Sequence, residues 1–407
     1  LDPGQANGAA SLASATSAGG DDTPQGLAKR RAEASASAKI DTSAYETLRD
    51  IDQLKSWCAM ARERGLVAFD TETTSLDAMQ AELVGFSLAL PETAPDTGEL
   101  KVRACYAPLA HSNGAGDLLG GGGAQSGQMP MQEALNELKA LLEDPAVLKI
   151  GQNLKYDMLV MAQHGISIES FDDTMLLSYA MHAGLHGHGM DTLSERYLSH
   201  TPIPIKPLLG TGKSAITFDK VPLVDAVKYA AEDADITLRL WQLFKPQLHR
   251  VGVTKVYETL ERPLVPVLAA MERSGVKVDR DTLSRMSNAF AQKMAGLEDE
   301  IYELAGRKFN VGSPKQLGEI LFDEMGLEGG KKGKTGAYAT GADVLEDLAT
   351  EHDLPARVLD WRQLSKLKST YTDALQDHIN PDTGRVHTSY SIAGASTGRL
   401  ASTDPNL

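Results

Sequence analysis

The sequence is poor in cysteine, in positive charge and in long apolar runs, and each shortage excludes a class of protein. Two cysteines, Cys58 and Cys105, occur among 407 residues, too few for a disulfide framework or a cysteine-based zinc site. No apolar run is long enough to span a membrane, and no basic segment followed by an apolar one opens the chain. These features predict a cytoplasmic protein in a reducing environment.

The balance of charge is acidic. A net charge of −15 argues against a protein that coats nucleic acid through its overall charge. It leaves room for a local basic groove, and it suits a protein that holds divalent cations. The length and a hydrophobic content of 42% are sufficient for two or three globular domains.

Composition divides the chain into three parts. Residues 1–42 are rich in Ala, Ser and Gly and have too little apolar surface to offset ordering, so we expect a disordered linker. Residues 43–255 have the pattern of one α/β domain, and residues 256–407 are mostly helical before they end in short β-like runs. The chain starts at Leu1 and stops at Leu407, and we expect a fragment of a longer protein.

In the α/β part, apolar runs come first and helical patterns follow. Runs that predict the strands of a meander are residues 66–69, 82–90 and 104–110. A glycine-rich loop over residues 113–130 separates them from the helical patterns, which cover residues 131–144, 172–183, 190–200 and 223–244. Residues 148–150 predict a short strand before a helix that begins near Asn153. This order predicts a ribonuclease-H-like mixed sheet with flanking helices.

One helix start stands out in the last part of the chain. In SPKQ, Ser313 is expected as the N-cap, Pro314 in the first turn and Gln316 as the residue that closes a capping box.

A pair of carboxylates ends the first predicted strand. In VAFDTETTSL, Asp70 and Glu72 are two residues apart, so in an extended chain their side chains point to the same face. A half-exposed acidic strand would explain this pair about as well as a function would. A hard cation such as Mg²⁺ or Mn²⁺, which binds carboxylate oxygens, would remove the repulsion between them.

Two later motifs supply further carboxylates. In GQNLKYD, Asn153 can begin a helix, and Asp157 follows four residues later on the same side. In YAAED, Tyr229 and Asp233 share one face of a helix, and two alanines between them allow close packing. Taken singly, each motif is explained better by an ordinary cap, a core-edge tyrosine or a solvated acid. Together with the carboxylate pair, they predict a metal site.

The order D-x-E, N-x-x-Y-D and Y-x-x-x-D resembles that of the DEDD exonucleases whose last motif contains a tyrosine. This resemblance implies that Asp70, Glu72 and Asp233 hold one metal ion. Asp70 would bridge to a second ion with help from Asp157, and Tyr229 would orient the attacking water. The two divalent ions, Mg²⁺ or alternatively Mn²⁺, would stabilise the attacking and leaving oxygens of phosphodiester hydrolysis.

Longer stretches resemble the bacterial family A DNA polymerases. GTGKSAITF and KYAAEDAD are similar to the proofreading exonuclease domain, whereas SPKQLGEILF and STGRLASTDPNL are similar to the start of the polymerase domain, its thumb and first part of the palm. The resemblance implies a monomer, associated with the bacterial nucleoid, that trims the 3′ end of DNA in replication and repair. It also implies that the polymerase carboxylates lie beyond residue 407, so this chain should not polymerise.

The same resemblance implies a set of DNA contacts. Leu76 and Phe218 match positions that stack on a frayed single strand, although a buried core explains Leu76 as well. Polar contacts to the single-stranded 3′ end are expected from Gln152, Asn153, Tyr156 and Arg196. Contacts to the primer–template duplex are expected from Lys366, Lys368 and Arg399. A solvated helix face explains Arg196 equally well, and without the resemblance it would be the favoured explanation of the two lysines.

Two other interpretations stay open, and one is excluded. An RNA-trimming exonuclease resembling ribonuclease D would share the three motifs but not residues 256–407. A DNA-binding module with a degenerate exonuclease site would not need all four carboxylates and the tyrosine. GTGKS and GKT look like the end of a P-loop, but that motif requires an earlier glycine where Pro207 and Glu328 stand.

Overall fold

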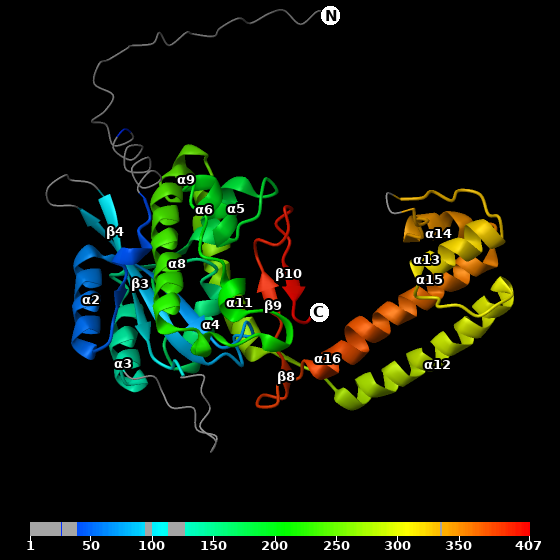
Figure 1. Ribbon diagram of the computed structural model, residues 1–407, viewed down its shortest axis with the longest axis horizontal. Helices are drawn as coiled ribbons and strands as arrows, with labels where there is room; N and C mark the ends of the chain where they lie inside the picture. The colour runs from blue at the N-terminus through cyan, green and yellow to red at the C-terminus, as the bar shows by residue number, and fades with distance from the viewer. Residues whose placement is uncertain (1–25, 27–38, 94–99, 113–126, 334–335) are drawn as a thin grey trace, which may run out of the picture. The chain divides into compact units, whose positions relative to one another are not determined.

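The computed structural model describes residue 26 and residues 39–93, 100–112, 127–333 and 336–407, which belong to two compact units, Leu1–Ala269 and Ala270–Leu407 (Figure 1). Most of the predicted linker and of the predicted glycine-rich loop lies outside the described residues. At the described end of the linker, Ile40 is buried and Asp41 caps the short 3₁₀ helix Thr42–Ala44.

One six-stranded mixed sheet forms the centre of the first unit. Its strand order is β1-β4-β3-β2-β5-β6, in which β2 pairs antiparallel with β3 and parallel with β5. The strands are β1 Glu46–Thr47, β2 Leu66–Thr73, β3 Leu83–Thr93, β4 Leu100–Pro108, β5 Leu148–Gly151 and β6 Phe171–Asp173. The predicted meander is confirmed as β2, β3 and β4. A helix was predicted from residue 172, and this boundary is wrong because residues 171–173 pair with β5 and the helix starts after its cap, Asp173.

Helices flank this sheet, and the long helix α8 packs along β2, β3, β4 and β5 (Figure 1). The helices of this unit are α2 Ile51–Arg64, α3 Met131–Leu142, α4 Lys155–Gln163, α5 Thr174–His182, α6 Met190–Tyr197, α7 Ile205–Leu209, α8 Leu223–Phe244, α9 Gln247–Arg250 and α10 Thr254–Val256. A π-helical turn, Tyr257–Glu261, leads from α10 into α11, Arg262–Ser274. Within the described residues, no helix is long and apolar enough to cross a membrane.

Small side chains let α8 approach the sheet closely. Ala231 and Ala234 of α8 belong to one buried cluster with Ala68 of β2. Because side chains alternate along a strand, Asp70 and Glu72 share the face of Ala68 and continue along β2 under the same helix. The packing of α8 therefore decides which of its side chains meet the carboxylate pair.

The loop between β5 and α4 differs from its prediction. The helix starts at Lys155, and Asn153 precedes it with a φ of 59°, in the left-handed region instead of at the N-cap. The peptide N–H groups of Asn153 and Leu154 donate to the carboxylate of Asp173 at 3.1 and 2.9 Å. The same carboxylate caps α5, so one buried acid organises the starts of two helices.

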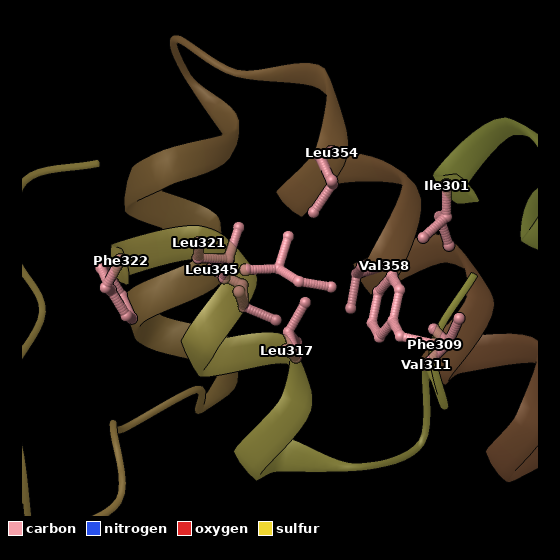
Figure 2. Close-up of a cluster of buried hydrophobic side chains, with 10 residues drawn as sticks. Ile301, Phe309, Val311, Leu317, Leu321, Phe322, Leu345, Leu354 and Val358 are labelled. Atoms are coloured by element: carbon pink, nitrogen blue, oxygen red, sulfur yellow. The ribbon is translucent and has the colours of Figure 1, made fainter. Parts of the chain in front are cut away.

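The second unit is mainly helical, with two small two-stranded sheets. Its elements are β7 Val276–Lys277, α12 Arg280–Ala305, α13 Pro314–Gly318, α14 Ala342–Ala349, α15 Asp353–Lys366, α16 Ala374–Asp377, β8 Arg385–Val386, β9 Ser389–Ser391 and β10 Ala401–Thr403. Figure 2 shows the core between these helices, to which Ile301, Phe309, Leu317, Leu345 and Val358 contribute.

Ser313 is the N-cap of α13, as predicted, and accepts a hydrogen bond from the peptide N–H of Gln316. The predicted capping box is wrong in its second half. The side-chain oxygen of Gln316 accepts from the peptide N–H of Asn310 at 2.8 Å, so it satisfies a donor further upstream.

Replacing Ala231 by leucine is expected to overpack the interface between α8 and the sheet. Ala231 is fully buried, and inserted methyl groups in such a place cost about 1–3 kcal/mol. Differential scanning calorimetry should therefore show a lower Tm for the first unit. Val224→Leu, at an exposed position of the same helix, is the control and should leave the Tm unchanged. Equal Tm values for the wild type and Ala231→Leu would contradict the close packing of α8.

Candidate metal centre

Three carboxylates from distant parts of the sequence meet at the end of β2. One oxygen each of Asp70, Glu72 and Asp233 lies within 4.8 Å of the other two, which is close enough for one cation to bind all three. Asp70 and Glu72 come from β2, and Asp233 comes from α8. Among the residues that the structure describes, no other group of His, Cys, Asp or Glu meets this spacing.

Asp157, in the first turn of α4, belongs to the same electrostatic environment. The peptide N–H and the hydroxyl of Thr71 donate to its Oδ1 at 2.9 and 2.6 Å, which holds this carboxylate against β2. The charge of Asp157 contributes to raising the pKa of Glu72, and the charge of Asp70 contributes to raising the pKa of Asp157. The structure therefore brings together all four carboxylates that the sequence singled out.

Removal from water is the main cause that raises the pKa of each of these four carboxyl groups well above its ordinary value. Nearby negative charges raise each pKa further; for Asp70 the charge is that of Asp233, and for Asp233 it is first that of Glu232. In the described part of the chain, Oε1 of Glu72 is buried without a hydrogen-bond partner. A divalent cation would satisfy that oxygen and offset the repulsion, and an all-oxygen donor set suits Mg²⁺ or Mn²⁺.

Tyr229 lies one helical turn before Asp233, and its hydroxyl is hydrogen-bonded to the Asp233 carboxylate. Burial, followed by the charges of Asp233 and Glu72, raises the pKa of Tyr229 far above its usual range. The hydroxyl therefore keeps its proton and can donate. The ring packs against that of Phe218, with 5.9 Å between centroids.

The predicted contacts to single-stranded DNA include three exposed side chains. Leu76 is 96% exposed in the loop after β2, so the alternative that it belongs to the core is wrong. Asn153 and Arg196 are exposed as well. Tyr156 is half-buried, and its hydroxyl donates to the carbonyl of Ser75, the residue before Leu76.

The other two predicted contacts of this group are buried. The side-chain amide of Gln152 donates to the carbonyl of His188 at 2.8 Å. Phe218 is 3% exposed and packs between the rings of His111 and Tyr229. The structure thus gives Phe218 a contact with the tyrosine of the site, and its contact with a base stays a prediction.

In the second unit, Lys366 and Arg399 are exposed. Lys368 is half-buried and forms an ion pair with Asp373 at 2.6 Å, so part of its charge is already compensated. Their contacts with a duplex stay predictions.

Sequence reasoning missed the residues that hold the ligands in place. Thr71 lies between the two strand ligands, and nothing in the motif reveals its bonds to Asp157. Asp173 could have been found, because an acid just before the helical pattern TMLLSYA is typical of an N-cap. Tyr106 of β4 is fully buried, and a Cβ on Gly85 would lie 2.3 Å from its hydroxyl, which explains the glycine in β3.

Comparison with known proteins finds two family models and several relatives that match the chain. Residues 45–249 match the family model described as 3′-5′ exonuclease, and residues 280–407 match the one described as DNA polymerase family A. The chain is 61% identical to DNA polymerase I of Rhizobium leguminosarum and 44% identical to that of Pseudomonas aeruginosa, over 95% and 92% of its own length. These alignments cover 38% and 39% of the two relatives, so the chain spans less than half of their length.

A solved structure described as the POL domain of Pol1 from M. smegmatis in complex with DNA primer-template and dNTP is similar to this chain. It matches with a TM-score of 0.66 and 26% sequence identity, over 87% of this chain and 54% of that chain. The two family models together cover most of the described residues. The chain belongs to DNA polymerase family A, and its first unit carries the 3′-5′ exonuclease region of that family.

Proposed function

We propose that the first unit is a proofreading exonuclease with a ribonuclease-H-like fold, which removes nucleotides from the 3′ end of DNA by two-metal-ion hydrolysis. The observation that supports this most directly is the meeting of Asp70, Glu72 and Asp233 at one end of β2, with Asp157 held against the same strand by Thr71. The match of residues 45–249 to the 3′-5′ exonuclease family supports the same conclusion.

The residues divide the chemistry between them. Asp70, Glu72 and Asp233 would hold one divalent ion, and Asp70 together with Asp157 would hold a second. When bound, the two ions stabilise negative charge on the attacking and leaving oxygens. Tyr229, kept protonated by its raised pKa, would hold the attacking water in line with the phosphate through its hydroxyl.

The substrate end would lie over the exposed side chains next to this centre. Leu76 is 96% exposed, so its apolar side chain is accessible to stack on an unpaired base. The hydrogen bond from Tyr156 to the carbonyl of Ser75 would keep that loop in place. Asn153 and Arg196 would contact phosphates or bases, with Gln152 behind them.

The second unit would be the thumb and the start of the palm of a polymerase domain. Its match to DNA polymerase family A, and a relative described with a bound DNA primer-template, support contact with duplex DNA. Lys366, Lys368 and Arg399 would serve as phosphate contacts there. The whole protein would then be a monomeric, template-directed DNA polymerase of replication and repair in the bacterial cytoplasm.

Two observations favour DNA proofreading over the alternatives. An RNA-trimming relative would not need a second unit that matches DNA polymerase family A over residues 280–407. A degenerate site would not be expected to keep all four acids together with a buried, unpaired oxygen of Glu72.

The first prediction for this site concerns Asp157→Asn. The amide keeps an oxygen for the two donors of Thr71 but removes the charge that would hold the second ion. With Mg²⁺ and 5′-labelled single-stranded DNA, we expect stepwise 3′ shortening by the wild type and a rate at least about 100-fold lower for the variant.

Asp225→Asn is the matched control, because Asp225 is an exposed acid on the same helix as Asp233. It should leave the rate unchanged. Cleavage by Asp157→Asn at the wild-type rate would contradict the assignment of the site. Equal shortening of an RNA of the same sequence would instead support the RNA-trimming alternative.

The second prediction concerns the thermal stability of the wild type and of Asp70→Asn, without and with a divalent cation. Folded carboxyl groups with a raised pKa hold protons that the unfolded chain releases near pH 4, so their contribution to the free energy of unfolding falls as the pH rises above about 4. Removing one repelled charge should raise the Tm at about pH 8 in EDTA relative to the wild type. Added Mg²⁺ should raise the Tm of the wild type more than that of the variant.

Asp225→Asn should leave the response of the Tm to Mg²⁺ unchanged, since its carboxylate is in water. A wild-type Tm that does not respond to millimolar Mg²⁺ or Mn²⁺ would argue against a cation site.

A further inference from the structure

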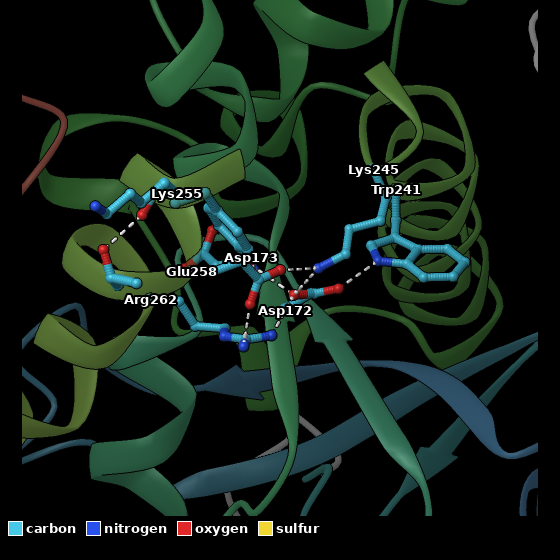
Figure 3. Close-up of polar contacts among 9 residues, drawn as sticks. Asp172, Asp173, Trp241, Lys245, Lys255, Glu258 and Arg262 are labelled. Atoms are coloured by element: carbon cyan, nitrogen blue, oxygen red, sulfur yellow. Dashed lines mark hydrogen bonds and ion pairs between the residues drawn. The ribbon is translucent and has the colours of Figure 1, made fainter. Parts of the chain in front are cut away.

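A buried acid outside the metal centre collects an unusual number of donors (Figure 3). Asp172, at 0% exposure in β6, receives hydrogen bonds at 2.8–3.2 Å from Trp241, Lys245, Tyr257 and Arg262. These donors come from the end of α8 and from the segment that leads into α11. The network thus joins β6 to the segment through which the chain leaves the first unit.

The charge of Asp172 is well compensated within this network. Lys245 and Arg262 are both ion-paired with it, and Glu258 balances the two cations in turn. Loss of one neutral donor would therefore leave Asp172 paired with two cations. One neutral donor of the network, the hydroxyl of Tyr257, makes a second hydrogen bond outside it.

Tyr257 is fully buried, and its hydroxyl makes two hydrogen bonds of opposite direction. It donates to Oδ1 of Asp172 and accepts from the peptide N–H of Asp173, both at 2.9 Å. Burial, and next the charge of Asp172, raise the pKa of Tyr257 above its usual range, so the hydroxyl keeps its proton. The direction of both bonds is thereby fixed, because a carboxylate can only accept.

Asp173 connects Tyr257 to the loop before α4. Its carboxylate accepts from the peptide N–H groups of Asn153 and Leu154, and Gly151 pairs with it in the sheet. The loop is tight, since a Cβ on Gly151 would lie 2.4 Å from the side chain of Leu154. Asn153 has a left-handed φ, which asparagine adopts more readily than most residues, and the bonds from its own N–H and that of Leu154 to Asp173 help to hold this conformation.

We infer that Tyr257 is a positioning residue for DNA in the exonuclease site: it fixes the Asp173 peptide and, through the Asp173 carboxylate, the backbone of Gln152 and Asn153. This inference rests on the proposed function. The two hydrogen bonds of the Tyr257 hydroxyl go to Asp172 and to the Asp173 peptide, and neither goes to a carboxylate of the cluster. It begins the π-helical turn Tyr257–Glu261, a geometry that is rare and is often found at functional sites.

Tyr257→Phe tests this inference because it removes the hydroxyl and keeps the ring. The ring also faces the cations of Lys245 and Arg262 at 5.0 and 5.7 Å, and phenylalanine preserves those contacts. Without its acceptor, the Asp173 peptide should lose its fixed orientation. We expect the KM for single-stranded DNA to rise about three- to tenfold while kcat stays within about twofold, because the metal ligands do not move.

Two control variants distinguish a positioning role of Tyr257 from a general loss of stability in this part of the first unit. Thr259→Val removes a hydroxyl two residues further along the same segment, where it donates to the carbonyl of Lys255 at the surface. Trp241→Phe removes a donor to Asp172 at 2.8 Å but does not touch the Asp173 peptide. Both should keep the wild-type KM at a temperature well below the Tm of every variant, even if Trp241→Phe lowers the Tm.

The outcomes distinguish this inference from the proposed function. A raised KM in Tyr257→Phe alone supports the positioning role. An active wild type with the same KM in Tyr257→Phe, or the same rise in KM for Trp241→Phe, overturns that role and leaves the proposed function intact. A wild type that does not shorten the oligonucleotide at all contradicts the proposed function, and the inference falls with it.

Discussion

Four negative charges held close together and away from water are the constraint on which the rest of the first unit depends. Burial and mutual repulsion raise the pKa of Asp70, Glu72, Asp157 and Asp233, so the metal-free arrangement stores unfavourable free energy. Folded proteins retain such a cost where a ligand repays it. Divalent cations would do so here, because they bring positive charge to a set of donors made of carboxylate oxygens alone.

Uncharged residues of the fold place these four carboxylates. Alternation along β2 puts two acids on the face under α8, and Ala231 lets that helix approach closely enough to add Asp233. Thr71 lies between Asp70 and Glu72 and, unlike them, donates hydrogen bonds. Its peptide N–H and its hydroxyl donate to Asp157 and hold that carboxylate against the strand. The ligands are thus fixed by packing and by peptide groups, which leaves their remaining oxygens free to bind ions.

Features that depend on the spacing of residues along a short segment could be predicted from the sequence. The meander of β2, β3 and β4 and the bounds of α8 followed from apolar periodicity, and the four carboxylates followed from short motifs. The errors have two origins. The late start of α5 and the position of Asn153 outside α4 depend on tertiary hydrogen bonds, between β5 and β6 and to the carboxylate of Asp173. The open capping box at Gln316 is a local effect, because its side chain accepts from the peptide N–H of Asn310 and not from that of Ser313. The bond from the Asp173 peptide to Tyr257 spans 84 residues, and no local pattern encodes it.

The proposed function requires that this cluster bind two divalent ions and that the carboxylate of Asp70 contribute to both sites. Electron paramagnetic resonance of Mn²⁺ added to the wild-type chain tests it directly, since ions about 3.5–4 Å apart are magnetically coupled. We predict the broad spectrum of a coupled manganese pair, replaced in Asp70→Asn by the signal of isolated or unbound ions. A wild-type spectrum that shows only isolated Mn²⁺ at every metal concentration would contradict the two-ion account.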